Sequence, residues 1–450
     1  MRWHGPHPLS VACDLSYFAT DCTDGCIMTF CIRRSLLSSL LILGLVAGTA
    51  SGGQDTPPTG TRITNSNWQQ YQQFMSAGLR ALFSGKYSWK MPDQAVFEVG
   101  PTVSIPLPKK YVQDTAAYSG NVKLKELDTG GTLPENYVAG VPFPVPAEPD
   151  AGAKVLWNLY YRYNPKVMRC VLDSRIIDRY LNVTTQKADY VISKLAHLSE
   201  PGMPHVLPES HGIYLTDYWE FIAPEHKKYL AQDSVVYDDP SRINEIYAFV
   251  PAMRKSLRLS AAARCAPGAG SDFTSEDLRF GFYGQPPLFK VTLEGEKKIL
   301  AMVHLNGRYS NWNNYVPPIF IPKPLVGKWE LRDVYVISLK RVGPDAGSYC
   351  YGKRVIYVDK QTWAPVAVES YDRSEKLWKV HLIGYHPVPI SDGEAMVGAG
   401  ASAGFHQLIN LQNQHVSGSV LVDTLVNANT GKYGNVRRYG LPDGLQQIMQ

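Results

Sequence analysis

The sequence predicts a mainly β fold with helices (α+β), built on an antiparallel sheet. Tyr, Phe and Trp are frequent, with 27, 14 and 9 residues among 450, and flat aromatic side chains pack well on pleated strands. Runs of alternating hydrophobic residues are separated by turns of only a few residues, and connections this short join antiparallel neighbours. Hydrophobic residues make up 44% and charged residues 19% of the chain, so we expect a sizeable core and no wholesale disorder.

The charge of the chain argues against a nucleic-acid partner. The formal net charge is +5, which is small for a chain of this length. Basic residues are scattered, and no run of them reaches the density of a nucleic-acid-binding stripe. We therefore expect no binding of nucleic acid.

Residues 28–50 have the pattern of a cleaved export signal. Arg33 and Arg34 form a positive region, and residues 36–47 form an apolar stretch. Small residues follow this stretch, namely Gly48, Ala50 and Ser51. The apolar stretch is too short to span a bilayer comfortably, because a spanning helix needs about 20 residues. We expect an exported, periplasmic protein, and the alternative is a retained anchor.

Residues 1–27 fit poorly in front of an export signal, whose positive region belongs at the start of the chain. We therefore expect Met28 to be the true initiator and residues 1–27 to be a mis-assigned extension. No cysteine directly follows the small residues of the signal, which argues against a lipid-anchored protein. Residues 51–66 are then a linker, residues 67–440 form a single domain, and residues 441–450 are a tail.

The cysteines after residue 50 favour one disulfide bond. Three are present there, Cys170, Cys265 and Cys350, and none has the C-x-x-C spacing of a metal site. Cys265 and Cys350 lie in loop-like, Gly-bearing stretches, so we predict that they pair in an oxidising periplasm. Cys170 has apolar neighbours and is expected to be a buried free thiol.

Two helices are expected before the main run of strands. Residues 67–83 and residues 149–160 both carry apolar side chains near helical spacing. Between the two, residues 101–149 are rich in Pro and Gly. We predict that this stretch is an irregular, extended excursion over the surface of the domain.

The strand pattern is clearest in pairs that are joined by turn signals. Residues 245–260 contain two runs separated by Pro-Ala. Residues 289–305 contain two runs with Glu294–Gly295 between them, which predicts a short hairpin. Asn306–Gly307 is a further turn signal at the end of this pair.

Four more strands are predicted to form a meander. They occupy residues 329–339, 353–359, 364–371 and 377–383. On the last of them Trp378, Val380 and Leu382 share one face, while Lys379 and His381 take the other. This alternation predicts a sheet that is buried on one side only.

One string resembles a catalytic motif, but its context argues against chemistry. Residues 400–404 match G-x-S-x-G, the nucleophile elbow of hydrolases, with Ser402 at the centre. The preceding residues are Gly- and Ala-rich and not a strand, and no acid followed by a histidine comes after Ser402. The chain also lacks an HExxH zinc motif and a phosphate-binding loop. We expect no enzyme activity, no bound metal and no cofactor.

The surplus of aromatic residues suggests an apolar pocket that holds a ligand. The candidates for its lining are Trp157, Tyr161, Trp219, Phe221, Trp329 and Trp378. The alternative for each of them is an ordinary place in the core of the sheet.

Five separate stretches, in one order along the chain, resemble a known family. They are Tyr137–Pro144 (YVAGVPFP), Gly152–Tyr163, Ala248–Ser260, Ser271–Gly284 and Lys353–Val380. Together they resemble domain-of-unknown-function family 1329, whose members are often labelled outer-membrane lipoprotein-sorting-like. The resemblance covers residues 65–440.

This resemblance implies a fold similar to that of the periplasmic lipoprotein carriers. Such a fold is a curved antiparallel half-barrel covered by helices, with an apolar interior that accepts acyl chains. The family supplies no catalytic residues, and the stretch 101–149 has no counterpart in a carrier.

The function that the resemblance implies is that of a non-enzymatic binding or carrier protein. Its cargo would be a lipid or another hydrophobic molecule of the cell envelope. An envelope transport complex is the implied partner, and association with the outer membrane is a further implication. The alternative is a structural or interaction protein that docks a protein partner on its curved sheet.

Overall fold

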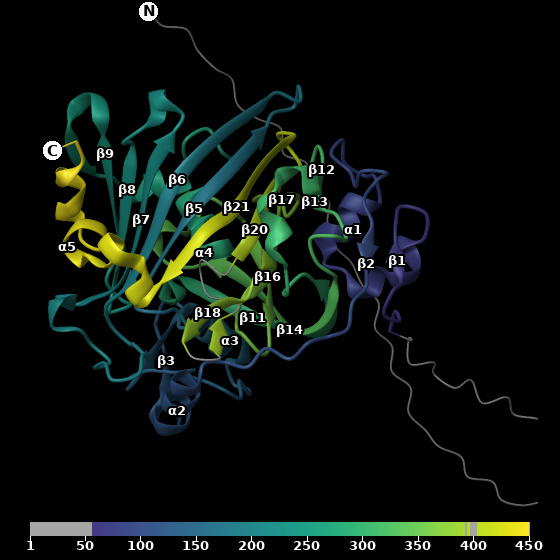
Figure 1. The fold of residues 1–450 in the computed structure, drawn as a ribbon. Coiled ribbons are helices and arrows are strands. Elements are labelled where there is room, and N and C mark those ends of the chain that lie inside the picture. Colours follow the sequence, from purple (N-terminus) through teal and green to yellow (C-terminus); the bar gives the residue numbers. More distant parts are fainter. Residues whose placement is uncertain (1–55, 392–393, 397–402, 450) are drawn as a thin grey trace, which may run out of the picture. The chain divides into compact units, whose positions relative to one another are not determined.

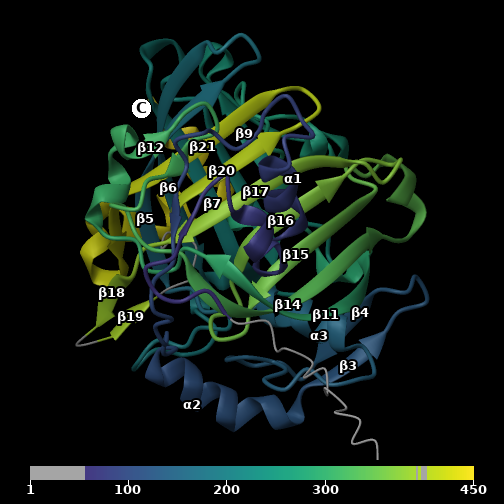
Figure 2. The same cartoon turned by 90° about the vertical axis from the view of Figure 1, so that its right-hand side faces the viewer.

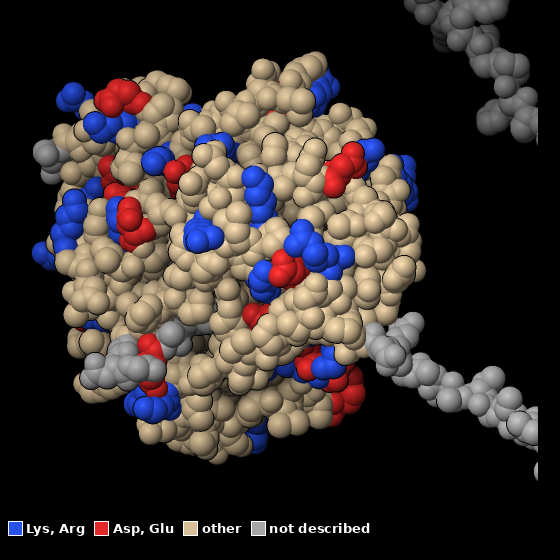
Figure 3. Space-filling model, turned by 45° about the vertical axis from the view of Figure 1, so that its right-hand side comes forward, with Lys and Arg blue, Asp and Glu red and all other residues tan. Residues whose placement is uncertain are grey.

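The computed structural model describes residues 56–391, 394–396 and 403–449, all of which belong to one compact unit, residues 56–450. The predicted export signal at residues 28–50, the stretch before it and Ser402 lie outside the described residues. On the face shown in Figure 3, positive and negative side chains are interspersed among a large majority of uncharged ones.

One large antiparallel sheet of thirteen strands dominates the described part of the chain. Its strands, in spatial order, are β10 (Lys255–Arg258), β9 (Glu245–Val250), β8 (Ala231–Tyr237), β7 (Ile213–Ala223), β6 (Val183–Lys194), β5 (Val167–Ile177), β21 (His415–Val426), β20 (Ala403–Asn410), β17 (Leu377–Tyr385), β16 (Pro365–Tyr371), β15 (Lys353–Asp359), β14 (Glu330–Arg341) and β11 (Phe289–Ala301). Figures 1 and 2 show that this sheet is strongly curved. The predicted α+β class with an antiparallel sheet is confirmed.

Short elements surround the sheet. Four small two-stranded sheets are β1 (Arg62–Ile63) with β2 (Phe97–Glu98), β3 (Lys123–Glu126) with β4 (Thr132–Glu135), β12 (Tyr315–Val316) with β13 (Ile321–Pro322), and β18 (Val388–Ser391) with β19 (Glu394–Met396). The α-helices are α1 (Ala77–Phe83), α2 (Lys109–Tyr118), α3 (Ala151–Tyr160), α4 (Leu278–Gly281) and α5 (Val436–Tyr439).

The path of the chain through the large sheet determines where a site can form. The chain enters at the central strand β5 and runs outward to β10 at one edge. It then crosses to β11 at the opposite edge and returns strand by strand to β21, which pairs with β5. The stretch between the two edges, residues 259–288, is called the crossover segment below.

The crossover segment lies on the concave face of the sheet. Lys379 of β17 donates to the carbonyl of Asp272 at 2.7 Å, and Arg354 of β15 donates to the carbonyl of Gly281 at 2.6 Å. A disulfide bond joins Cys265 to Cys350, with the two Cα atoms 5.2 Å apart. The segment is therefore fixed to strands that lie far from its own two ends.

Helices and loops cover both faces of the sheet. Helix α3 packs on β11 and β14 on the concave side, while α1 packs on β17 on the other side (Figures 1 and 2). Near the C-terminus α5 and the 3-10 helix Pro442–Gln447 pack on the strands from β6 to β10. Most of the sheet is consequently buried on two sides, and hydrophobic clusters form on each side.

This covering overturns the prediction that the strand at residues 377–383 is buried on one side only. Lys379 is 3% exposed and His381 is 1% exposed, although both point away from Val380 and Leu382. The crossover segment covers them, and the carbonyl of Asp272 in this segment accepts a hydrogen bond from the ammonium group of Lys379. A polar residue on an alternating strand can thus be buried when a distant segment satisfies it.

The predicted hairpin at Glu294–Gly295 is wrong. Residues 289–301 form one strand, β11, which pairs with β14 along its whole length. A bulge between Leu293 and Gly295 absorbs one extra residue, and Gly295 adopts a φ of 131° there. Glycine tolerates this conformation, so the signal marked a bulge within a strand and not a turn between two strands.

The early helix and the Pro-rich stretch also differ from expectation. Residues 67–83 form a 3-10 helix at Trp68–Phe74 and then α1, because Ser76 caps a new helix by accepting from the amide of Leu79 at 3.1 Å.

The stretch 101–149 is irregular only in part, since it contains α2, β3 and β4. Tyr111 anchors α2 because its hydroxyl donates to the carbonyl of Tyr161 at 3.0 Å. The second predicted helix, at 149–160, agrees with α3.

Candidate ligand cavity

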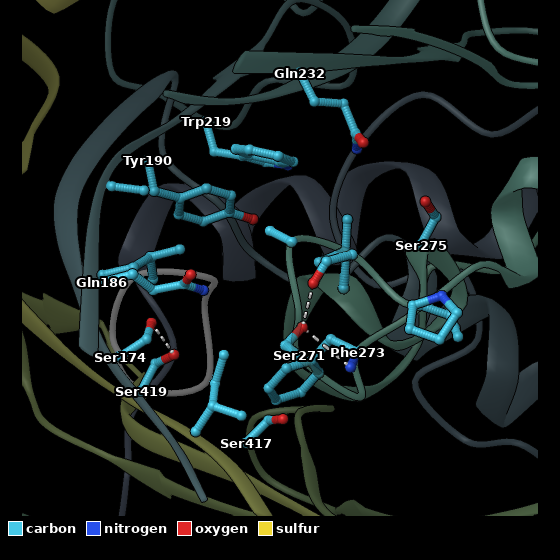
Figure 4. A pocket seen from close by; sticks show the side chains of 18 of the residues that line it. Ser174, Gln186, Tyr190, Trp219, Gln232, Ser271, Phe273, Ser275, Ser417 and Ser419 are labelled. Atoms are coloured by element: carbon cyan, nitrogen blue, oxygen red, sulfur yellow. Dashed lines mark hydrogen bonds between the residues drawn. The ribbon is translucent and has the colours of Figure 1, made fainter. Parts of the chain in front are cut away.

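A cavity of about 270 Å³ lies between the concave face of the sheet and the crossover segment. Figure 4 shows Tyr190 and Trp219 on one side of this space and Ser271 and Phe273 on the other. The sheet contributes alternate residues of six strands, namely Leu172, Ser174, Ile176, Gln186, Ala188, Tyr190, Trp219, Phe221, Gln232, His406, Ser417 and Ser419. Alternate residues of a strand point to the same face, which is why these side chains converge.

The crossover segment supplies the opposite wall, and this wall is mostly apolar. Its lining side chains include Leu259, Ala263, Pro267, Phe273, Leu278, Arg279 and Phe280. Pro267 and Gly268 are exposed, so this part of the wall borders the solvent. An apolar lining of this kind binds hydrophobic groups by removing them from water.

Several polar groups of the lining are hydrogen-bonded within the protein. The hydroxyl groups of Ser174 and Ser419 are 2.7 Å apart (Figure 4). Ser271 donates to the carbonyl of Gly268 at 2.7 Å. Lys227 donates to the amide oxygen of Gln186 at 2.8 Å. Because these groups are satisfied within the protein, they do not require a polar ligand.

Two buried histidines lie at one end of the cavity: His406 lines it, and His381 lies next to His406 with 5.6 Å between the ring centroids. His381 and His406 are buried, and within the described residues their ring nitrogens have no hydrogen-bond partner. Phe273 packs on both rings, with centroids 5.4 and 4.8 Å away. Burial lowers the pKa of His406 to about 3, and burial followed by the neighbouring His406 lowers the pKa of His381. Both rings are therefore neutral near neutral pH, and neither stores a proton for acid–base work.

A buried ionic cluster fixes the crossover segment against the sheet. Asp277 accepts from Arg354 at 3.1 Å and from the hydroxyl of Tyr351 at 2.6 Å, and Lys379 lies 3.6 Å away. Burial alone would raise the pKa of Asp277, but Lys379 and Arg354 overcome this effect and lower it to about 2. The wall of the cavity is consequently held by charges that stay paired across the physiological range of pH.

Two of the six predicted aromatic residues lie in the cavity lining. Trp219 and Phe221 are alternate residues of β7, and their ring centroids are 5.2 Å apart. These two residues stand next to the crossover segment because β7 lies between the centre and the edge of the sheet.

The other four predicted aromatic residues lie in packed regions away from the cavity. Trp157 and Tyr161 belong to an aromatic cluster around α3, with ring centroids 5.6 Å apart. Trp329 stacks on Phe97 at 4.0 Å. Trp378 packs on Tyr351 at 5.6 Å.

Sequence reasoning missed several lining residues. Leu172, Ser174 and Ile176 alternate on β5, and Ala188 and Tyr190 alternate on β6. The sequence itself contains this two-residue spacing, which is the same pattern that predicted the other strands. Arg279 and Phe280 had no such signal, since they come from a turn whose residues take left-handed φ values of 50° and 57°.

The described residues offer no evident metal site. No group of three or more His, Cys, Asp or Glu side chains among them could hold a metal ion. Cys170 is a buried free thiol, and burial raises its pKa. No helix in the described part of the chain is long and apolar enough to cross a membrane.

Comparison with known proteins gives a family and one curated relative. The family described as "Protein of unknown function (DUF1329)" matches residues 62–436. An uncharacterized protein of Pseudomonas aeruginosa is 23% identical over 328 residues, which are 71% of this chain and 67% of that protein.

Three bacterial proteins of solved structure resemble part of this chain. A Vibrio parahaemolyticus domain described as an outer membrane lipoprotein-sorting protein has 14% identity and a TM-score of 0.45, over 64% of this chain and 97% of that one. A DUF1329 family protein from Desulfovibrio piger has 13% identity and a TM-score of 0.45, over 64% and 96%. A LolA superfamily protein from Nitrosomonas europaea has 12% identity and a TM-score of 0.35, over 61% and 92%. All three TM-scores are below 0.5, and the architecture above rests on this chain's own structure.

Proposed function

The chain belongs to the DUF1329 family of proteins of unknown function, and on this premise we propose that it binds or carries a lipid or another hydrophobic molecule. The observation that carries the proposal is the cavity between the concave face of the sheet and the crossover segment. Its lining is mostly apolar, and several of its polar groups are already hydrogen-bonded within the protein.

The size and lining of the cavity support a single apolar chain as cargo. A volume of about 270 Å³ lies just below the usual range of about 300–1,000 Å³ for ligand pockets, which suits a narrow ligand. Each methylene group that leaves water for such a lining gains about 0.8 kcal/mol. A chain of ordinary length is held by this gain alone, without a covalent bond or a metal.

The proposed role is binding and transport, not catalysis. The two buried histidines that adjoin the cavity are neutral, and no carboxylate or nucleophile is paired with them in the described residues. A carrier needs only an apolar lining and a wall that can move.

The proposed location is the periplasm. The predicted export signal at residues 28–50 supports it, and so does the Cys265–Cys350 disulfide bond, since such bonds persist in oxidising compartments. The proposed partner is an envelope transport complex, with the outer membrane as a further place of association.

The alternative is an interaction protein that docks a partner on its curved sheet. That function would need a free sheet face, whereas the crossover segment and α3 cover the concave side and α1 covers part of the other. The structure thus lends the alternative less support than the cavity lends the carrier.

The experiment that tests the carrier function is lipid extraction and mass spectrometry of the protein purified from periplasm without detergent. A stoichiometric hydrophobic molecule is the expected result. Ala188→Phe fills the cavity from β6, and it should abolish the bound molecule. Thr185→Phe is the matched control, because Thr185 is exposed on the other face of the same strand.

Two outcomes would contradict the proposal. In the first, the wild type carries no molecule and takes up no fluorescent fatty-acid probe. In the second, folded Ala188→Phe and Thr185→Phe proteins carry the same amount of cargo as the wild type, which would place the cargo elsewhere.

A further inference from the structure

Arg279 is a buried arginine in the wall of the cavity. It is 3% exposed and lines the cavity from the crossover segment. Its backbone adopts a φ of 50°, and its carbonyl accepts from Arg162 at 2.9 Å. The position of the Arg279 side chain is thus set by a turn that the core holds in place.

No carboxylate in the described residues lies within 4.0 Å of the Arg279 guanidinium group. Three other arginines with little exposed surface do have such a partner: Arg264 lies 2.7 Å from Glu276, Arg332 lies 2.8 Å from Asp359, and Arg354 lies 3.1 Å from Asp277. Arg279 differs from all of them in that it borders the cavity without a paired acid.

The groups that surround Arg279 satisfy only part of its hydrogen-bonding capacity. One N–H donates to the carbonyl of Tyr160 over a long 3.4 Å, and the hydroxyl of Tyr214 is a second hydrogen-bond partner. The rings of Tyr160 and Tyr283 lie 5.7 and 5.8 Å from the guanidinium carbon. A guanidinium group carries five N–H donors, and it binds carboxylates through two parallel hydrogen bonds. Capacity for an anion therefore remains.

Asp217 is a nearby buried acid, and it does not replace such an anion. Burial raises the pKa of Asp217 to about 6, even though Arg279 and Arg162 act to lower it. At neutral pH this carboxyl group is therefore mostly ionised, and its charge acts on Arg279 from a distance. It forms no ion pair with Arg279 within 4.0 Å, so it does not occupy the N–H donors of the guanidinium group.

We propose that the cargo is a single-chain amphiphile with one carboxylate group, and that Arg279 pairs with this carboxylate. The inference rests on the proposed function, because it assigns a ligand class to the same cavity. The apolar lining holds the chain and Arg279 holds the acid group. A buried charge without a partner is unfavourable, so the anion gains more at this position than a neutral group of the same size.

The test compares dodecanoate with 1-dodecanol, two probes that share a chain and differ in charge. Binding to the delipidated protein is measured by calorimetry at neutral pH. The wild type should bind dodecanoate about tenfold or more tightly than the alcohol, since a hydrogen bond to a charged group is worth that much. Arg279→Gln should lose this preference and still bind the alcohol.

The matched control is Arg341→Gln. Arg341 is half-buried. Like Arg279 it has no carboxylate within ion-pair distance in the described residues, but it does not line the cavity. Its substitution should leave the preference for dodecanoate unchanged. Arg279→Lys, which keeps the charge and loses the forked geometry, should show an intermediate preference.

The outcomes separate this inference from the proposed function. Equal binding of acid and alcohol by the wild type would overturn the inference and leave the carrier function intact. Binding of neither probe would count against the carrier function itself. A folded Arg279→Gln protein that still prefers dodecanoate would also overturn the inference, as would dodecyl phosphate that binds about tenfold more tightly than dodecanoate.

Discussion

Asp277 is the residue on which the buried charges of the crossover segment converge. It is 1% exposed and contacts Tyr351 and Arg354 near the start of β15 and Lys379 on β17. Removing one member of a buried ion pair costs more than the pair contributes, because the remaining charge is left without a partner.

We predict that Asp277→Asn destabilises the protein by about 3–5 kcal/mol, since it leaves both Arg354 and Lys379 buried without a full counter-charge. Urea unfolding followed by circular dichroism measures the effect. Asp345→Asn is the control, because Asp345 is an exposed acid in a nearby loop. Equal stability of the two variants would contradict the role assigned to Asp277.

The same carboxyl group predicts a pH dependence. Its pKa in the folded state is about 2, below the value near 3.9 of an unfolded Asp. A carboxyl group whose pKa is lower in the folded state stabilises the protein above the unfolded pKa, and this contribution is lost as the pH falls through the folded pKa. The difference in unfolding free energy between wild type and Asp277→Asn should therefore shrink by roughly 2 kcal/mol from about pH 5 to about pH 2. A difference that stays constant over this range would refute the assignment.

Sequence alone could predict the residues that follow a local rule. Trp219 and Phe221 were candidates because they are aromatic, and they lie in the lining as alternate residues of β7. Arg279 could not be found in this way, because its position depends on a turn inside the crossover segment. Trp157 and Trp329 carry the same aromatic signal as Trp219 but lie in the packed core, since residue type does not say which face of the sheet remains open.

At the scale of elements, the crossover segment depends on one covalent link. The Cys265–Cys350 bond closes a loop of 85 residues. A cross-link over a loop of this length stabilises a protein by about 4 kcal/mol, mainly through the unfolded chain. The Cys265→Ser/Cys350→Ser double variant should lose about this much stability. Thermal unfolding with and without a reducing agent measures it, and a reducing agent should lower the Tm of the wild type and not that of the double variant.

Helix α3 packs closely on strand β11 because Gly152 has no side chain at the contact. A Cβ atom at Gly152 would lie 2.6 Å from the backbone nitrogen of Leu293 and 2.8 Å from the carbonyl carbon of Thr292. Gly152→Ala should therefore destabilise the protein by about 1–3 kcal/mol through overpacking, despite the better helix propensity of Ala. Gly347→Ala is the matched control, because a Cβ atom there meets nothing within 4 Å. Chemical unfolding of both variants checks the prediction, and a stabilised Gly152→Ala protein would show that the two elements can move apart.

The elements that sequence predicted best are those with local turn signals. The strands at 353–359 and 364–371 agree closely with β15 and β16, because Asp359 begins a turn by accepting from the amides of Gln361 and Thr362. The hairpin at Glu294–Gly295 failed because the same glycine signal suits a bulge, and the choice between them depends on the length of β14. Which strands meet in the centre could not be predicted, since β5 and β21 are far apart in the chain.

At the scale of the whole molecule, the pairing of β5 with β21 joins an early half of the sheet to a late half. Without the other half, each half would expose the unpaired backbone N–H and C=O groups of an edge strand at this position. We therefore predict that the protein unfolds in one cooperative transition, in which tryptophan fluorescence and far-ultraviolet circular dichroism give the same midpoint. Two separate midpoints would show that one half of the sheet is stable alone.

The crossover segment also spans the concave face of the curved sheet from one edge strand to the other. Its two ends continue into the outermost strands, and its middle is bonded to β15 and β17 through Arg354 and Lys379. A change in the curvature of the sheet (Figures 1 and 2) therefore moves these anchors and alters the space between the segment and the lining strands. The room for cargo is thus coupled to the curvature of the sheet as well as to the side chains of the lining.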